Sequence, residues 1–505
     1  MPGELIVHVE AHDGLPPIRT TGELQALQSG IERLAPASQN ARRESDVAST
    51  QPVYADTAGP TGNAPGPISI PIGPTAALVP MAVGGSDSDL LALMRTLTRA
   101  VAQGAGGAVV ALPEGRVITL RAASPNWLVG AAGGETIGTG GPADKPKSAL
   151  AADAAAALTF PALERALLQQ PIDVYVLDTL PAPPGDSDAK GKSAAWSEAA
   201  RKVPLGKAWL GKWHANRRNA DVHVSADRLL TRQAAPPVML PTPTGAKVPG
   251  QDFDMAWHGP FAASLIRRVS HNARIHLIEV LNAQGTGTLA SVAWGLSQVA
   301  ERQPHQGGLF LINCSFTFAI PVNADGLKVS GHDQTGLPAD WQDWLANGGQ
   351  AITAEMLEGL FGHAVRDRQQ GLIFAAAGND SNESVVFAAR YPAWLPSVVG
   401  VGALTESGQR AAYSNAPDSP IQDGLMTQGT ATGLYLGALP GGKPNLTGQA
   451  VWSGTSFATP IITGAVARLV SQSLMTPAQA LAKLRSSQPE LESTTLGEVV
   501  TSRRN

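Results

Sequence analysis

The chain has a single cysteine, Cys314, among its 505 residues. One cysteine excludes an internal disulfide and any zinc site built from several cysteines. This composition fits a reducing compartment, although many secreted enzymes also lack disulfides. The sequence has no run near the roughly 20 apolar residues of a membrane-spanning helix, and its first residues show neither a basic start nor a long apolar segment. We therefore expect a cytoplasmic protein without a membrane partner.

An excess of charge of one sign is also lacking, since the net charge is only −4. Such a balance selects no polyanionic partner. The segment 180–256 is an exception, because Trp196, Trp209 and Trp213 are interleaved with lysine and arginine there. This pattern could bind nucleic acid, but no nucleic-acid-binding fold motif accompanies it. The preferred interpretation is a solvated insertion that packs its tryptophans on the main domain, and we expect no nucleic-acid partner.

Glycine and proline are abundant, with 54 and 39 residues, and their distribution suggests where folded parts begin. Residues 1–85 predict an N-terminal extension that is largely linker-like, with one short helix at 21–34, because residues 36–80 are poor in large apolar side chains. Residues 86–158 predict a small α+β segment made of a helix, a hairpin and a Gly/Pro-rich connector. One interpretation of this segment is an ordinary small cap, or extra strands, on the main domain.

Residues 159–505 predict the main domain, with insertions near 180–256 and 319–350. The second insertion is expected to be loop-like, with Trp341 and Trp344 as packing anchors. Between the insertions, apolar strands alternate with helices of 3.6-residue period. Alternating strands and helices imply right-handed crossovers and a parallel sheet covered on both faces. The expected fold class is α/β, a three-layer α/β/α domain with a mainly parallel sheet.

The sequence Gly454-Thr-Ser-Phe-Ala-Thr-Pro460 precedes a long apolar segment. A serine at a helix start lies near unpaired backbone N–H groups and the positive end of the helix dipole, which stabilise a developing anion. Taken alone, Thr455 or Ser456 is more often only a helix cap. The motif nevertheless resembles the serine motif of the subtilisin-like serine proteases, the subtilases, which implies a subtilisin-like fold and Ser456 as a nucleophile.

That resemblance implies three further residues in a fixed order. Asp178 ends the apolar run at 172–177, where open α/β sheets place their sites, although strand-terminal aspartates are also common caps. His258 opens an apolar helical segment, although Pro260 and Phe261 stand where the family commonly has threonine and a second histidine. Asn379 ends the sequence I-F-A-A-A-G-N, which is similar to the oxyanion motif of the family.

The segment Cys314-Ser-Phe-Thr-Phe318 is similar to the family segment that runs beside the substrate. The resemblance implies that Ser315, Phe316 and Gly378 line the substrate site. Phenylalanines replace the small residues that are usual there, so the specificity pocket is expected to be altered or partly filled. Cys314 is interpreted as a small buried residue rather than as a second nucleophile.

The residues at 121–128 resemble the end of a subtilase inhibitory propeptide, so the chain's own N-terminal segment is a candidate occupant of the cleft. Overall the resemblance implies a serine endopeptidase that acts on polypeptides through Asp178, His258 and Ser456, with Asn379 in the oxyanion hole. It implies no cofactor for the chemistry and leaves structural calcium open. The alternative is an occluded or catalytically silent scaffold that serves as a protein-interaction module.

Overall fold

The computed structural model describes most of the chain, with gaps. The described residues are 4–34, 50–52, 69–83, 87–103, 107–131, 143–149, 158–159, 171–181, 225–227, 253–306, 308–318, 320, 339–367, 369–418, 424–486, 498–499 and 503–504. Most of the predicted insertion at 180–256, with its three tryptophans, and the helix expected at 163–168 lie outside these ranges. Among the described residues, no helix is both long enough and apolar enough to cross a membrane.

The N-terminal part is a folded α+β unit, in contrast to the linker predicted for residues 1–85. Strands β1 (Glu4–Ala11) and β4 (Ala76–Val83) pair antiparallel within a sheet whose order is β2-β4-β1-β6-β5, with β3 beside β4. Leu5, Val7 and Val9 are fully buried in β1, which gives this sheet an apolar core of its own. The remaining strands are β2 (Thr50–Pro52), β3 (Ile70–Pro71), β5 (Ala108–Ala111) and β6 (Val117–Pro125).

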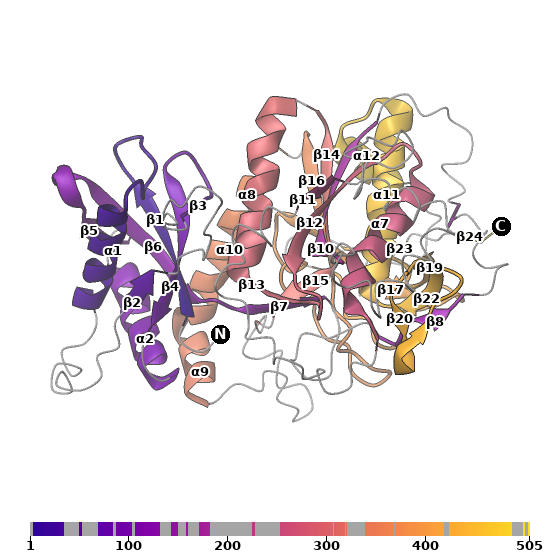
Figure 1. Cartoon of the computed structure of the whole chain (residues 1–505), viewed down its shortest axis with the longest axis horizontal. Coiled ribbons are helices and arrows are strands. Elements are labelled where there is room, and N and C mark those ends of the chain that lie inside the picture. Colours follow the sequence, from indigo (N-terminus) through magenta and orange to yellow (C-terminus); the bar gives the residue numbers. More distant parts are fainter. Residues whose placement is uncertain are drawn as a thin grey trace, which may run out of the picture.

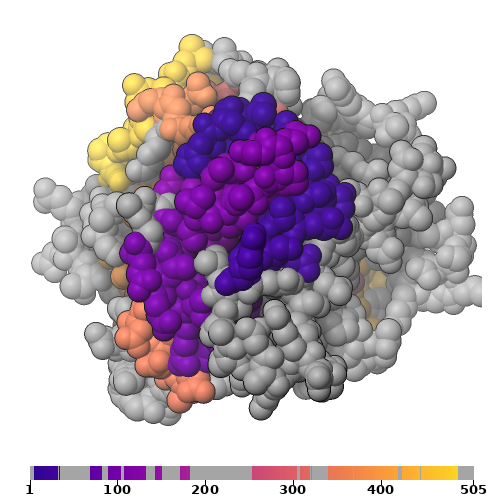
Figure 2. All heavy atoms as spheres, turned by 90° about the vertical axis from the view of Figure 1, so that its left-hand side faces the viewer, coloured from indigo at the N-terminus to yellow at the C-terminus, as the bar shows by residue number. Residues whose placement is uncertain are grey.

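Two helices belong to the same unit: α1 (Thr21–Leu34), which confirms the predicted short helix, and α2 (Asp87–Gln103). The predicted hairpin is also confirmed, since β5 and β6 pair antiparallel across the turn at Pro113–Gly115. Together, α1, α2 and the sheet make up what we call the N-terminal unit, at the left of Figure 1. Figure 2 shows the outer face of this unit, which covers one end of the molecule.

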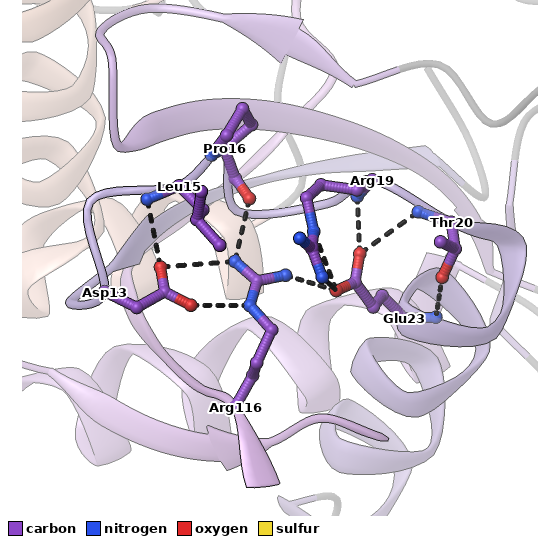
Figure 3. Close-up of polar contacts among 7 residues, drawn as sticks. All are labelled: Asp13, Leu15, Pro16, Arg19, Thr20, Glu23 and Arg116. Atoms are coloured by element: carbon purple, nitrogen blue, oxygen red, sulfur yellow. Dashed lines mark hydrogen bonds and ion pairs between the residues drawn. The ribbon is translucent and has the colours of Figure 1, made fainter. Parts of the chain in front are cut away.

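A polar cluster closes the start of α1 (Figure 3). Thr20 and Glu23 cap the helix reciprocally: the Glu23 N–H donates to the Thr20 hydroxyl at 3.2 Å, and the Thr20 N–H donates to the Glu23 carboxylate at 3.1 Å. The Arg116 guanidinium contacts the Glu23 carboxylate and donates to Asp13 at 2.6 Å. Hydrogen bonding to Arg116 lowers the pKa of Asp13 to about 2. The cluster thus ties the turn before β6 to α1.

His8 on β1 makes the stability of the N-terminal unit pH-dependent. Burial lowers the pKa of His8 from 6.5 to about 4, against a raising effect of Glu10 and with a further lowering by Arg121. A depressed folded-state pKa means that stability is full above pH 6.5 and is lost as the pH falls towards 4, because the unfolded chain then binds more protons. The loss expected from a shift of this size is about 3 kcal/mol.

We expect His8→Gln to flatten the pH dependence of hydrogen exchange at β1 and β4 between pH 7 and pH 4. His363, whose pKa burial also lowers to about 4, titrates in the same range, so His363→Gln is the matched control. Its effect is expected at α10 and not at β1. An equal pH slope in wild type and His8→Gln would show that His8 is not the titrating group.

The large sheet of the main domain has the predicted parallel core. Its order is β15-β7-β13-β12-β10-β14-β16-β17-β18-β23, and the pairs from β12 through β23 are parallel. Strand β14 is buried at all five positions and β16 at all six, as expected of strands covered on both faces. The core strands are β12 (Arg274–Leu281), β10 (Asp173–Thr179), β14 (Phe310–Cys314), β16 (Gly371–Ala376), β17 (Val398–Leu404), β18 (Leu425–Gln428) and β23 (Glu498–Val499).

Helices cover both faces of this sheet (Figure 1). Helices α8 (Leu289–Gln306) and α10 (Gln350–Ala364) lie between it and the sheet of the N-terminal unit, where the hydroxyls of Ser124 and Thr353 are 3.1 Å apart. Helices α7 (His258–Val269), α11 (Thr455–Ser473) and α12 (Pro477–Ser486) cover the other face. The predicted three-layer α/β/α domain is therefore confirmed.

Part of the second predicted insertion is helical rather than loop-like. Helix α9 (Ala339–Trp344) continues through a π-helical turn at Leu345–Gly349 into α10. Trp344 is buried and its indole N–H donates to the Thr98 hydroxyl of α2 at 3.1 Å. The prediction of Trp344 as a packing anchor is confirmed, and its partner is the N-terminal unit.

The remaining short strands lie at the margins of the main domain. Strands β7, β13 and β15 extend the large sheet, and β19, β22 and β8 form a separate three-stranded sheet. Their bounds are β7 (Leu128–Ala131), β13 (Thr286–Thr288), β15 (Phe316–Phe318), β19 (Thr430–Leu434), β22 (Gln449–Ser453) and β8 (Lys147–Ser148). Minor pairs are formed by β9 (Leu158–Thr159) with β24 (Arg503–Arg504), β20 (Ala438–Leu439) with β21 (Lys443–Pro444), and β11 (Ser225–Asp227) with β12.

Candidate active site

Asp178 and His258 form a fully buried pair. Asp178 lies near the carboxyl end of β10, and His258 is the first residue of α7. The imidazole Nδ1 is 2.8 Å from one carboxylate oxygen of Asp178 and 3.0 Å from the other. A carboxylate accepts hydrogen bonds, so it fixes the tautomer with the proton on Nδ1 and the lone pair on Nε2. Among the described residues, His258 Nε2 has no hydrogen-bond partner although it is buried.

Gly259 allows α7 to start this close to β10. A Cβ on Gly259 would lie 2.2 Å from the Thr179 carbonyl oxygen and 3.0 Å from Asp178 Cβ. The Gly259 N–H instead donates to the Thr179 hydroxyl at 2.9 Å. Pro260 sits in the first turn of α7, where its missing N–H costs no helical hydrogen bond. Pro260, the first of the two departures from the family motif, is therefore compatible with this helix start.

Ser456 lies in the first turn of α11 and is fully buried. The cap residue of this helix is Gly454, with no side-chain capping bond, so the interpretation of Thr455 or Ser456 as a simple helix cap is wrong. The Ser456 hydroxyl donates to the Ser315 carbonyl oxygen at 3.2 Å. The structure thus places Ser456 and Ser315 together, and no hydrogen bond joins Ser456 to His258 among the contacts of the described residues.

Asn379 follows β16 and faces the start of α11. Its side-chain oxygen accepts the Thr455 N–H at 2.9 Å, which orients the side-chain amide. Gly378 before it has φ of 113°, and its N–H donates to the Thr455 hydroxyl at 3.2 Å. A Cβ at Gly378 would lie 2.6 Å from the Asn415 side chain. Both the conformation and the space therefore require glycine here.

A buried chain of hydrogen bonds that the sequence did not predict holds Ser315 against the segment 453–456, which we call the serine loop. The Asn313 amide donates to the Ser315 hydroxyl at 2.9 Å, which donates to the Ser456 carbonyl at 2.8 Å. The Thr463 hydroxyl, on α11, lies 3.1 Å from the Asn313 side-chain oxygen. The signal available in the sequence is the presence of Asn313 at the end of an otherwise apolar strand, because a buried polar side chain needs partners.

Aromatic rings enclose the imidazole of His258. Its centroid is 5.2 Å from that of Phe457 and 5.6 Å from that of Trp452, which meets it at 86°. Phe261 packs on both of these rings, so its replacement of a polar family residue extends an apolar wall. An apolar wall strengthens electrostatic interactions within the site by excluding water.

Cys314 is buried at the end of β14, and burial raises the pKa of its thiol. A thiol whose pKa is raised is protonated at neutral pH and is a poor nucleophile. The interpretation of Cys314 as a small buried residue is confirmed.

Strand β7, from the end of the N-terminal unit, lies between β13 and β15 and pairs antiparallel with both. In this register Ala131 is opposite Phe316 and Val129 is opposite Phe318. Because Ser315 precedes Phe316 and contacts Ser456, β7 runs towards the serine. Phe316 and Phe318 are both fully buried. The predicted alteration of the specificity pocket stays a prediction.

The described residues contain no group of three or more His, Cys, Asp or Glu side chains able to hold a metal ion. Asp178 and His258 are engaged with each other, and neither belongs to such a group.

Comparisons with known proteins place these residues in context. Residues 250–500 match the sequence model of the Subtilase family, a range that contains His258, Asn379 and Ser456 and begins after Asp178. An extracellular protease of Xanthomonas campestris pv. campestris is 28% identical over 244 residues, covering 46% of this chain and 36% of that protein. Subtilisin E of Bacillus subtilis is 35% identical over 103 residues, covering 20% of this chain and 24% of that protein.

The chain thus spans about a third or less of the length of these two curated relatives. Among solved structures, a cold-adapted subtilisin-like serine proteinase is similar at 18% identity and a TM-score of 0.36, covering 68% of this chain and 92% of that chain.

Proposed function

Because the chain belongs to the subtilase family, we propose that it is a serine endopeptidase that hydrolyses peptide bonds through an acyl-enzyme on Ser456. The observation that carries this proposal is the buried Asp178–His258 pair, whose imidazole keeps Nε2 as a lone-pair acceptor beside the serine loop. A neutral imidazole in this tautomer is the form that a general base requires.

In the proposed reaction His258 Nε2 takes the proton of the Ser456 hydroxyl as its oxygen attacks a peptide carbonyl. The hydroxyl must first leave the Ser315 carbonyl, a bond of 3.2 Å that is long for a hydroxyl donor and therefore weak. Asp178 holds the imidazole and stabilises its cation. His258 then protonates the leaving amine, and water releases the acyl group by the same steps in reverse order.

The tetrahedral oxyanion would be held by the Asn379 amide and the Ser456 backbone N–H. Two features support this assignment. The Asn379 side-chain oxygen is fixed by the Thr455 N–H, which orients the amide group, and Ser456 lies in the first helical turn, whose N–H groups have no intrahelical partner.

We further propose that the N-terminal unit inhibits its own main domain. Strand β7 adds to β15 and β13 by backbone pairing, the way an extended peptide adds to a sheet edge, and it runs towards Ser456. Self-processing would cut the chain between Ala131 and Ala143, the described residues on either side of the junction.

A serine-directed fluorophosphonate tests the hydrolase proposal. The full chain, fresh and after incubation, is treated with the reagent and its intact mass is measured, and the adduct is located by peptide mapping. An adduct on Ser456 supports an active nucleophile, and a cut between Ala131 and Ala143 supports self-processing. Labelling without a cut supports the hydrolase proposal and contradicts the proposal of a self-processed N-terminal unit. If neither occurs, the occluded, protein-binding scaffold is the better account.

A further inference from the structure

Residues 143–149, which we call the arm, lie along β22 just before the serine loop. Strand β8 within the arm pairs antiparallel with β22, so that Lys147 is opposite Val451. Beyond this pair, the Ala143 N–H donates to the Ser453 carbonyl at 3.0 Å, and the Ala149 N–H donates to the Gln449 carbonyl at 3.3 Å. The arm is therefore docked over its whole length, although the sequence predicted a Gly/Pro-rich connector in this part of the chain.

Asp144 is the residue of the arm on which the donors of β22 converge. The Ser453 N–H donates to one carboxylate oxygen at 3.0 Å, and the Ser453 hydroxyl donates to the other at 3.3 Å. The indole N–H of Trp452 donates to the Asp144 carbonyl at 2.8 Å. Lys147 of the arm itself adds an ion pair at 3.2 Å. Hydrogen bonds to a charged acceptor are stronger than neutral ones, so this contact favours a carboxylate.

The position of this contact relates it to the reaction. Ser453 is three residues before Ser456, and the Trp452 ring packs on the imidazole of His258. On the other flank of Ser456, β7 pairs with β15 beside Ser315. The chain runs from β7 to the arm, so the arm follows Ser456 in the direction of the peptide. A peptide bound across Ser456 in that direction has its leaving-group half on β22.

We propose that Trp452 and Ser453 form a subsite that recognises an acidic residue on the leaving-group side of the bond that is cut, and that Asp144 is its occupant within the chain. This inference rests on the proposed peptidase function and adds to it a substrate class, peptides with a carboxylate side chain after the scissile bond. An alanine in place of the acid leaves the Ser453 N–H and hydroxyl donors without an acceptor. A lysine places an ammonium group, itself a donor, against the same two donors. Asparagine retains an acceptor for the Ser453 N–H and is expected to bind at an intermediate level.

The subsite is tested by peptide binding to the full chain carrying Asp144→Ala, which removes the carboxylate of the arm and weakens its docking on β22. The probe is a fluorescently labelled hexapeptide with the sequence of residues 143–148, and its binding is measured by fluorescence polarisation. The comparison peptide has alanine in place of the aspartate. We expect the acidic peptide to bind at least about tenfold more tightly to Asp144→Ala. Adding Ser453→Ala to this variant should reduce the difference without removing it, because alanine loses the hydroxyl donor and keeps the backbone N–H. The chain with intact Asp144 should bind either peptide weakly, because its own arm competes. Ser148→Ala, an exposed residue of the same arm, is the matched control and should leave the subsite filled.

Equal affinities of the two peptides for Asp144→Ala, or a preference that Ser453→Ala leaves undiminished, would overturn the proposal. Turnover gives a second readout, with fluorogenic peptides that carry Asp, Ala or Lys in turn at the first three positions after the scissile bond. The preference for Asp should appear in KM. Fluorophosphonate labelling of the same samples separates the two failures: labelled protein without acidic preference refutes only the subsite, whereas unlabelled Ser456 refutes the peptidase.

Discussion

Replacing Ser456 by alanine is expected to leave the chain uncut between Ala131 and Ala143 and to reduce peptide turnover by about 10⁶-fold. The size is that known for the serine nucleophile of another subtilase, and it reflects the loss of the only atom that can form the acyl bond in the proposed reaction. The substitution removes one hydroxyl whose recorded hydrogen bond, to the Ser315 carbonyl, is long. We therefore expect the fold to persist, as circular dichroism and thermal unfolding would show.

Intact mass spectrometry over time measures the cut, with Ser384→Ala as a matched control because Ser384 is an exposed serine in a loop of the same domain. The control should process like wild type. If purified Ser456→Ala is cut at the same position and rate, the cleavage comes from another enzyme or another nucleophile. Mixing it with wild type then distinguishes cutting within one chain from cutting between chains.

Replacing Asn379 is expected to lower kcat by about 10² to 10³ with little change in KM, because a donor to the oxyanion acts only in the transition state. This magnitude also comes from another subtilase. Asn379 has a second role, since its oxygen accepts the Thr455 N–H at 2.9 Å. Alanine removes both functions at once, so its effect alone would be ambiguous.

Asn379→Asp separates the two roles. Aspartate keeps an oxygen for the Thr455 N–H near the helix N-terminus and lacks the amide donor. We expect both variants to lose kcat to a similar extent, and Asn379→Asp to unfold at a temperature closer to that of wild type. Near-wild-type kcat in Asn379→Asp would contradict the oxyanion role and leave Asn379 as a residue that only holds the start of α11.

The parallel core was predictable because its strands carry their own signal. Strands β14, β16 and β17 are short apolar runs, and burial on both faces leaves no alternation to interpret. The candidate site residues were named through the resemblance of their motifs to those of the subtilases. The structure places Asp178 and Asn379 at or just after the carboxyl ends of such strands, and His258 and Ser456 at helix starts. Sequence motifs alone, however, do not predict that the Ser456 hydroxyl points to the Ser315 carbonyl. They also do not predict the hydrogen bonds that link Asn313, Ser315 and Ser456.

The N-terminal unit was missed for identifiable physical reasons. Strand β4 contains Pro80, which normally argues against a strand with partners on both sides, yet Pro80 is opposite Ile6 in a paired register. The apolar residues of β1 and β4 are separated by about 65 residues of chain with low hydrophobicity, and their pairing is a long-range event without a local signal. The docking of Asp144 on Ser453 was hidden similarly, since a Gly/Pro-rich segment indicates a connector unless its partner is known.

The pairing of β15 has a consequence for the chain once it has been cut. Strand β7 is the one strand that pairs with β15 within the described part of the large sheet. Departure of β7 would turn β15 into an open edge whose backbone amides at 316–318 exchange with solvent and invite another extended chain. Until a substrate arrives, the freed enzyme is therefore prone to pairing with a second unfolded or extended polypeptide. In the proposed uncut state, the N-terminal unit would protect this edge as well as block the site.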